Sequence, residues 1–357
     1  MAADSETTPS DPRAVPEVGA VMERHGLGSL ASGAVTFPGR NDNWAGVTST
    51  GVWVFVKKID GPGAAGRFGR SLSFTRLPPA DAAVDSPSCI AFDEASHVLV
   101  FELLEGAVSG GNLERQKLFT PAMARDAGRV VGRLHHMPVV DGTLDTTAYA
   151  WPPLDGLKAL TMGEFAVCSG AQLELFGLLQ KDAPLVRSVA NLAAVSQKAA
   201  LTPAHCDLRL DQFLVRHERL YLCDWEELRV EDPARDVGAF VGEWVHRCVH
   251  AIALKGPATD ETIISSGVQA LENRRPFLLA FWRGYQEAGE VTDPGLVSRA
   301  TAFAGWHLLD RIRATNADRA RLRALDRAGI GIARRLLYAP DLFCGILGLS
   351  SSQKGAS

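Results

Sequence analysis

The sequence lacks several features that would place it in a class of protein at once. It has no apolar run long enough to cross a bilayer, and its N-terminus has neither the basic start nor the apolar centre of a signal peptide. The 6 cysteines form no CxxC pair and match no zinc spacing, which favours a reducing compartment over a zinc module. The net charge of -4 gives no general attraction to nucleic acid or anionic membrane. We therefore expect a cytoplasmic protein that binds neither nucleic acid nor a membrane.

The composition is that of an ordinary globular protein, with 46% hydrophobic and 22% charged residues, so the chain can form a sizeable core. Residues 1–16 are polar and contain prolines, and we expect a disordered N-terminal arm there. Residues 350–357 are expected to form a flexible tail. Between them, the pattern predicts a β-rich lobe over 17–105 and a helical lobe over 106–349.

The predicted N-terminal lobe is mostly β-sheet. The run Gly51–Val56 is dense in β-branched and aromatic residues and ends at two lysines. Ile90–Phe92 and Val98–Phe101 are predicted to be paired strands, joined by a polar turn. A helix is expected over 66–77, between the first strand and this pair.

The predicted C-terminal lobe is helical with one interruption. The apolar periodicity predicts helices over 121–137, 171–181, 185–199 and from 232 almost to the end. A strand-rich segment interrupts them at 202–226. The expected architecture is therefore an α+β fold in two lobes, with a catalytic hairpin embedded in the helical one, which is the layout of a protein-kinase-like fold.

The interrupting segment carries the residues with chemical potential. Phe213–Val215 and Leu220–Cys223 are short apolar runs joined by four polar residues, which predicts a hairpin. A hairpin brings its open ends together, and here these ends are Gln212 and Asp224. Asp207 lies in the loop just before them. Two carboxylates and an amide oxygen are thus expected to converge, and oxygen ligands around an open site suit Mg²⁺.

This segment resembles the HxDxxxxN motif, followed by a metal-binding Asp, of the aminoglycoside phosphotransferase and choline kinase family. The resemblance implies an ATP-dependent phosphotransferase that uses ATP and Mg²⁺. It implies that Asp207 is the catalytic base and that Gln212 and Asp224 bind the metal. The run Asp232–Val237 resembles the family's DPxxDLA helix start, in which Asp236 is expected to brace the catalytic loop.

The resemblance extends to the nucleotide side of the site. Val54–Lys57 resembles the strand whose lysine contacts the α- and β-phosphates, so we assign that role to Lys57 rather than Lys58. Phe37–Trp44 lies where the nucleotide-covering loop belongs, and Glu102–Leu104 lies where the adenine-binding hinge belongs. The predicted nucleotide-binding residues are Lys57, Gly39, Asn41, Asn43, Glu102 and Leu104.

Arg209 is a further catalytic candidate, because a guanidinium in the catalytic loop can steady the transferring phosphate, although it can equally pair with Asp211. His246 and His250 share a helix face with Glu243, but the HExxH order of zinc enzymes is absent, which favours a packing role. One more cluster is expected either to line the acceptor pocket or to pack on the core: Trp306, His307 and Asp310.

Two departures from the family pattern matter. Gln212 stands where the family has Asn, and its extra methylene can shift the metal site. Kinases pair the strand lysine with a Glu of the following helix, but the stretch 66–77 has no acidic residue and offers Thr75 near that place. Either Lys57 pairs elsewhere or a partner protein completes the site. A degenerate pseudokinase that only binds is therefore an alternative.

The acceptor is suggested by a narrower resemblance. Gly39–Gly46 together with Val54–Lys58 is similar to the kinase subunits of class V lanthipeptide synthetases and related thioamitide pathways. This implies that the substrate is Ser or Thr of a ribosomally made precursor peptide, and that a separate lyase partner later eliminates the phosphate. The alternative is a small-molecule kinase acting on an aminoglycoside, choline-like or sugar hydroxyl.

Overall fold

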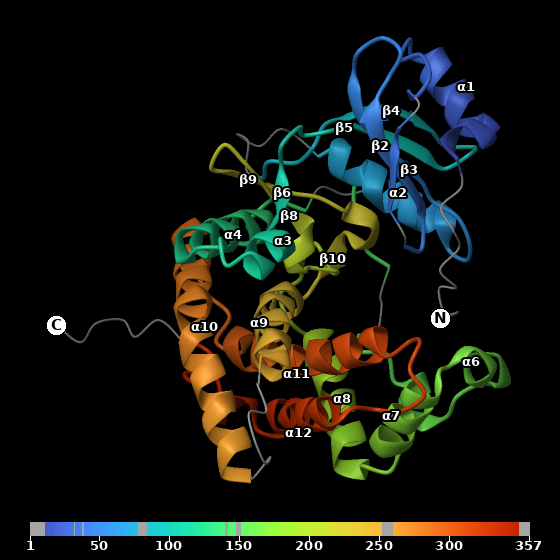
Figure 1. The fold of residues 1–357 in the computed structure, drawn as a ribbon. Helices are drawn as coiled ribbons and strands as arrows, with labels where there is room; N and C mark the ends of the chain where they lie inside the picture. Colours follow the sequence, from blue (N-terminus) through green and yellow to red (C-terminus); the bar gives the residue numbers. More distant parts are fainter. Residues whose placement is uncertain are drawn as a thin grey trace.

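The computed structural model describes residues 11–31, 33–37, 39–77, 84–139, 142–147, 151–251 and 260–349. The predicted tail and the first ten residues of the predicted arm lie outside this part. Two lobes are stacked end to end, with the sheet in one and most of the helices in the other (Figure 1). The predicted boundary at residue 105 falls in the turn that joins them. No helix of the described residues is both long and apolar enough to span a membrane.

The N-lobe is built on a five-stranded antiparallel sheet of order β1-β2-β3-β5-β4. The predicted strands are present, and two more precede them, which the sequence analysis did not identify. Their polar and glycine residues give little strand signal, so pairing with β3 decides their structure. The strands are β1 Val35–Phe37, β2 Asp42–Val47, β3 Trp53–Lys58, β4 Cys89–Asp93 and β5 Val98–Glu102.

The two faces of this sheet are covered by two helices. Side chains alternate along each strand, and Trp44 and Val56 on one face pack against α1 (Pro16–Arg24). The opposite face packs against α2 (Ala64–Thr75) through Leu99, the cross-strand neighbour of Lys57. Lys57 therefore lies on the α2 face of the sheet.

Order begins earlier in the chain than the sequence analysis expected. Within the predicted arm, Pro12–Ala14 form a short 3-10 helix, and α1 starts at Pro16. Proline is favourable in the first turn of a helix, where its missing N–H is not needed. The buried apolar face of α1 supplies the contacts that hold this segment on the sheet.

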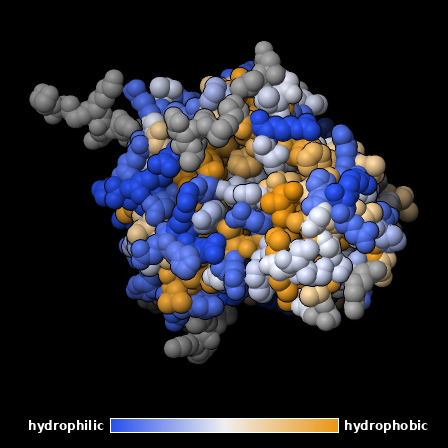
Figure 2. All heavy atoms as spheres, turned by 90° about the horizontal axis from the view of Figure 1, so that it is seen from above, coloured by the Kyte–Doolittle hydropathy of each residue, from blue (hydrophilic) through white to orange (hydrophobic). Residues whose placement is uncertain are grey.

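The face of the N-lobe that is seen from above is not uniformly polar: hydrophobic patches lie among hydrophilic ones (Figure 2). Some large apolar side chains of the sheet strands are exposed, namely Val35, Phe37, Trp53, Ile90 and Phe92. Scattered exposed apolar residues are normal on a globular protein.

The C-lobe is helical as expected, and the helices predicted over 121–137, 171–181 and 185–199 are present within a few residues. Local signals explain their starts, because Thr120, Ser169 and Asp182 each accept a hydrogen bond from a backbone N–H of the first turn. The helices are α3 Gly110–Arg115, α4 Pro121–His135, α5 Asp155–Lys158, α6 Met162–Val167, α7 Gly170–Gln180, α8 Ala183–Ser196, α9 Ala234–His250, α10 Asp260–Ala288, α11 Leu296–Thr315 and α12 Ala324–Tyr338.

The predicted hairpin is confirmed as β8 (Phe213–Arg216) and β9 (Arg219–Leu222). Its turn is tighter than expected, since the strands take up two of the four polar residues. The remaining two, His217 and Glu218, have positive φ angles of 48° and 62°, as a two-residue hairpin turn requires. Three short strands complete the sheets around it: β6 Val108–Ser109, β7 Thr202–Ala204 and β10 Arg229–Glu231.

Glycines let α4 and α10 pack with their backbones in contact. A Cβ atom on Gly128 of α4 would collide with the carbonyl oxygen of Phe281, and one on Gly284 of α10 would collide with that of Arg125. This approach matters for the site, because α4 also carries His135, which contacts Asp236 at the start of α9.

We expect Gly128→Ala to lower the free energy of unfolding by about 1–3 kcal/mol, because the added methyl group must push two helices apart. Gly177→Ala is the matched control. Gly177 also lies in a helix, but a Cβ there would meet nothing within 4 Å. This control should stabilise the protein by about 0.4–1 kcal/mol. Urea unfolding measures both, and equal effects would contradict the close packing.

Candidate active site

The catalytic loop is held by a buried carboxylate at the start of α9. Asp236 accepts hydrogen bonds from the backbone N–H groups of His205 at 2.7 Å and Cys206 at 2.8 Å. It also accepts one from Nε2 of His135, on α4, at 3.1 Å. Burial works against ionisation, yet these hydrogen bonds and the charge of His135 lower the pKa of Asp236. The bracing geometry predicted for Asp236 is therefore present.

Both predicted acidic residues sit beside strained backbone. Cys206, just before Asp207, has φ 66°, and Asp224 itself has φ 73°, both in the left-handed region that non-glycine residues rarely adopt. Arg235 stabilises this backbone conformation at Cys206 by donating a hydrogen bond to the Cys206 carbonyl at 2.7 Å. Such strain persists only where surrounding contacts enforce it, and it concentrates at functional sites.

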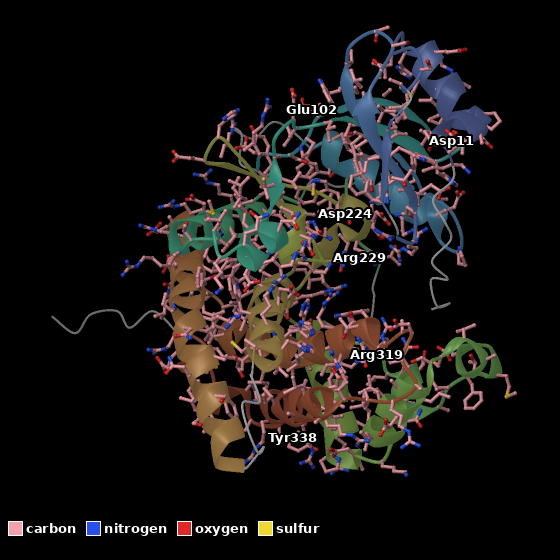
Figure 3. All side chains as sticks on the ribbon, in the orientation of Figure 1. Asp11, Glu102, Asp224, Arg229, Arg319 and Tyr338 are labelled. Atoms are coloured by element: carbon pink, nitrogen blue, oxygen red, sulfur yellow. The ribbon has the colours of Figure 1, made fainter. Side chains whose placement is uncertain are left out.

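The hairpin brings Gln212 and Asp224 together as predicted. The Gln212 amide donates to Asp224 Oδ2 at 3.3 Å, and Asp224 lies at the junction of the lobes (Figure 3). His205 ties the loop to the hairpin by donating to the carbonyl of Cys223 at 2.9 Å. Asp207 lies beside the same end of the hairpin, because its backbone N–H donates to Nδ1 of His205 at 3.4 Å and His205 contacts Cys223. The side chain of Asp207 is 47% exposed, so water or an acceptor can reach it.

The two carboxylates have opposite pKa shifts. The protein around Asp207 reduces its access to water, and this burial raises the pKa of Asp207. The positive charge of Arg209 lowers that pKa, but only enough to offset part of the effect of burial. Burial acts in the same direction at Asp224, but the ammonium of Lys57 outweighs it and lowers the pKa of Asp224 to about 2. Asp207 is therefore a better proton acceptor than an ordinary Asp, whereas Asp224 stays ionised. Arg209 pairs with Asp207 at 3.3 Å.

The partner of Lys57 comes from the other lobe. Its ammonium lies 2.5 Å from Asp224 Oδ1 and also contacts the Glu226 carboxylate. Glu226 belongs to the 3-10 helix Trp225–Glu227, directly after Asp224. Burial opposes the charge, but these two carboxylates raise the pKa of Lys57. The missing acid of helix 66–77 is thus replaced by Glu226, without a partner protein.

Helix α2 carries the opposite charge from that expected of a kinase. Arg67 lies 3.5 Å from the Glu226 carboxylate, and Arg70 lies 3.1 Å from that of Glu227. Phe74 stacks on Trp225 with ring centroids 3.6 Å apart. Thr75, near the position of the usual Glu, donates to a carbonyl of its own helix. Helix α2 therefore docks on the segment that follows the metal-site Asp.

The predicted nucleotide-covering loop reaches the same carboxylate. Asn41 donates its side-chain amide to Glu226, and Asn43 donates to the carbonyl of Asn41 at 3.1 Å. Between Gly39 and Asn41, Arg40 contacts Glu226 at 2.9 Å. A Cβ on Gly39 would meet nothing within 4 Å, so this position borders open space.

The hinge side of the site contains a cavity of about 500 Å³, within the range of small-molecule sites. Leu104 lines it together with Phe37, Ala45 and Trp53. Glu102 does not line it and instead pairs within the sheet. Trp53 and Lys57 lie four residues apart on β3, roughly 13 Å in an extended strand. A ligand in this cavity can therefore reach toward the lysine.

The remaining candidates make packing contacts and ion pairs. Glu243 contacts Arg247 of α9 and both His307 and Arg311 of α11. The rings of His246 and His250 pack edge to face, with centroids 4.4 Å apart. The described residues contain no group of three or more His, Cys, Asp or Glu that could hold a metal. Asp310 pairs with Arg313 on the same helix at 3.0 Å. Trp306 packs edge-on against Trp151.

Sequence reasoning did not single out Arg40, Arg67, Arg70 or Glu226. The signal that would have found them is charge complementarity. Two arginines one helical turn apart, on a helix without acidic residues, match the consecutive acids Glu226 and Glu227.

A two-lobed fold with a lysine-bearing strand and two acidic residues on one cleft defines a phosphotransferase enzyme of the protein-kinase-like type. The chain belongs to the phosphotransferase enzyme family, whose sequence model matches residues 40–258. No curated protein sequence matches the chain significantly.

Solved structures agree on the fold. A choline/ethanolamine kinase family protein from Mesorhizobium loti is 17% identical, with a TM-score of 0.52 over 94% of this chain and 98% of that one. An amicoumacin kinase in complex with AMP-PNP, Ca²⁺ and Ami is 12% identical, with a TM-score of 0.52 over 93% of this chain and 94% of that one. An aminoglycoside phosphotransferase bound to streptomycin and ATP is 13% identical, with a TM-score of 0.50 over 93% and 99%.

We expect Glu226→Gln to lower the free energy of unfolding by roughly 3 kcal/mol, because it removes one carboxylate from a buried ammonium. Glu227→Gln, in the same 3-10 helix but more exposed, should cost roughly 1 kcal/mol or less. Chemical denaturation of both variants measures the difference. Equal losses would mean that Lys57 does not depend on Glu226.

Proposed function

We propose that the protein transfers the γ-phosphate of ATP to a hydroxyl group with the help of Mg²⁺. The observation that carries this proposal is the alignment of Lys57 and the two differently tuned acids, Asp207 and Asp224, at one cleft. Lys57 would hold the nucleotide phosphates. Asp207 would take the proton of the acceptor hydroxyl while the hydroxyl oxygen bonds to the γ-phosphorus. At the same time the bond from the γ-phosphorus to the β–γ bridging oxygen breaks, and ADP leaves.

The side chains at the hairpin's open end fit a magnesium ion. The Asp224 carboxylate and the amide oxygen of Gln212 are hard ligands of the kind that Mg²⁺ prefers. Despite the extra methylene of Gln212, its side-chain amide stays close to the proposed metal site, since the amide lies within hydrogen-bond distance of Asp224. When bound, the metal supplies charge neutralisation of the phosphates.

We propose that the cavity beside the hinge binds the base of the nucleotide. Leu104 and the aromatic side chains of Phe37 and Trp53 give it apolar walls. Two of the similar structures contain ATP or its analogue AMP-PNP. Of the predicted hinge residues, Leu104 has the position for adenine contact, whereas Glu102 would contribute only through the sheet.

We propose further that the acceptor is Ser or Thr of a precursor peptide, with a lyase acting afterwards. The acceptor side would run along α11 from Asp310 to its partner Arg313, whose carbonyl accepts a hydrogen bond from Gln172 of α7, the helix that follows α6. Helix α6 buries none of its residues, and its Met162 is 84% exposed. An open surface of mixed charge with an apolar end suits an extended chain better than a compact polycation.

A small-molecule hydroxyl is the second candidate acceptor. The similar structures are those of a choline/ethanolamine kinase family protein, an amicoumacin kinase and an aminoglycoside phosphotransferase in complex with streptomycin. A pseudokinase is the least supported alternative, because Glu226 supplies the acid whose absence from α2 motivated it. We propose a cytoplasmic setting on the cysteine pattern alone.

The test is phosphorylation followed by mass spectrometry. The protein is incubated with ATP and Mg²⁺, and with candidate precursor peptides or hydroxylated small molecules from its genomic neighbourhood. We expect a gain of one phosphate on a peptide Ser or Thr, lost in Asp207→Asn, which keeps the side-chain shape but cannot accept the proton. Phosphate on a small molecule would instead identify the protein as a small-molecule kinase. Binding of ATP without any transfer or hydrolysis would overturn the proposed activity.

Activity should depend on the protonation of Asp207, which must be ionised to act as a base. Because its pKa is raised, turnover should fall on acidification at a higher pH than for an ordinary Asp. Arg209→Ala removes a charge that lowers this pKa, so the acidic limb of kcat/KM should move further up. Arg209→Lys retains the charge and should leave the limb nearer its original place. Identical limbs in both variants would show that another group controls the rate.

A further inference from the structure

We propose that Arg40 is a further catalytic residue, which contacts the γ-phosphate of the nucleotide from the loop between β1 and β2. The inference rests on the proposed function and adds a residue to its site. In phosphotransferases of this kind the reaction is accelerated mainly by positioning and by positive charge around the transferred group.

The first support is the position of the guanidinium. Arg40 reaches across the cleft from the N-lobe, with Nη2 lying 2.9 Å from Glu226 and 3.5 Å from Glu227. Both contacts use this one nitrogen. An arginine has five N–H donors in a rigid fork, so donors remain for a phosphate while the carboxylates hold the side chain in place.

The second support is exposure. Lys57, Arg67 and Arg40 all contact the Glu226 carboxylate. The side chains of Lys57 and Arg67 are 10% and 5% exposed, whereas that of Arg40 is 39% exposed. Arg40 is therefore the cation of this group that solvent, and hence an anionic ligand, can reach.

The third support is charge. Glu226 contacts Lys57 and Arg67 as well as Arg40, so Arg40 shares this carboxylate with two other cations. Burial opposes the charge of Arg40, but Glu226, Glu227 and Asp207 raise its pKa. The guanidinium is therefore within electrostatic reach of the base. A γ-phosphate transferred to an acceptor beside Asp207 would therefore come within reach of Arg40.

The division of labour follows from these positions. Lys57, fixed deep between two carboxylates, would hold the inner phosphates. As the γ-phosphorus leaves the bridging oxygen for the acceptor oxygen, and Asp207 takes the hydroxyl proton, negative charge spreads over the three oxygens of the transferred group. The donors of Arg40 would stabilise that charge.

Comparison of ADP with AMP-PNP tests the contact, because only AMP-PNP carries a γ-phosphoryl group. With Mg²⁺ present, calorimetry should show Arg40→Ala weakening AMP-PNP binding about tenfold or more while changing ADP binding about twofold or less. The slow hydrolysis of ATP without acceptor should fall about a hundredfold or more. Arg40→Lys keeps the charge without the fork and should fall between.

Arg70→Ala is the matched control, since Arg70 also binds Glu227 but lies on α2 and is largely buried. It should weaken ADP and AMP-PNP binding by the same factor. Equal effects of Arg40→Ala on both nucleotides, or none on either, would overturn the assignment while leaving the proposed function intact. Wild-type protein that binds neither nucleotide would instead overturn the proposed function itself, and this inference with it.

Discussion

The ammonium of Lys57, held between Asp224 and Glu226, is the interaction on which the rest of the site depends. It is nearly buried, and a buried charge is tolerated only when paired. Its two partners come from the other lobe, so the pair joins the sheet to the catalytic hairpin. The same ammonium keeps Asp224 ionised, which a metal ligand requires.

The charges of α2 follow from this arrangement. With Glu226 occupying the place of an acid on α2, a second carboxylate there would repel it, whereas Arg67 and Arg70 attract it and its neighbour Glu227. The stacking of Phe74 on Trp225 adds apolar contact between the same elements. The lobes therefore meet through α2 and the 3-10 helix, directly beside the metal-site residue.

The catalytic loop is positioned by a separate set of contacts. Asp236, from the start of α9, fixes the backbone around Cys206, and α4 contributes His135 to the same carboxylate. The two helices thus hold the base independently of the nucleotide side.

The sequence by itself determined the hairpin, the convergence of Gln212 with Asp224 and the lysine-bearing strand, because these depend on local periodicity and short spacing. It did not determine β1, β2 or α1, whose order comes from packing on the sheet. Nor did it identify the partner of Lys57. That pairing joins residues 169 positions apart, by numbering from 57 to 226, and depends on how the lobes meet. Only the tertiary structure decided it, since Coulomb attraction between distant residues acts once folding has brought them together.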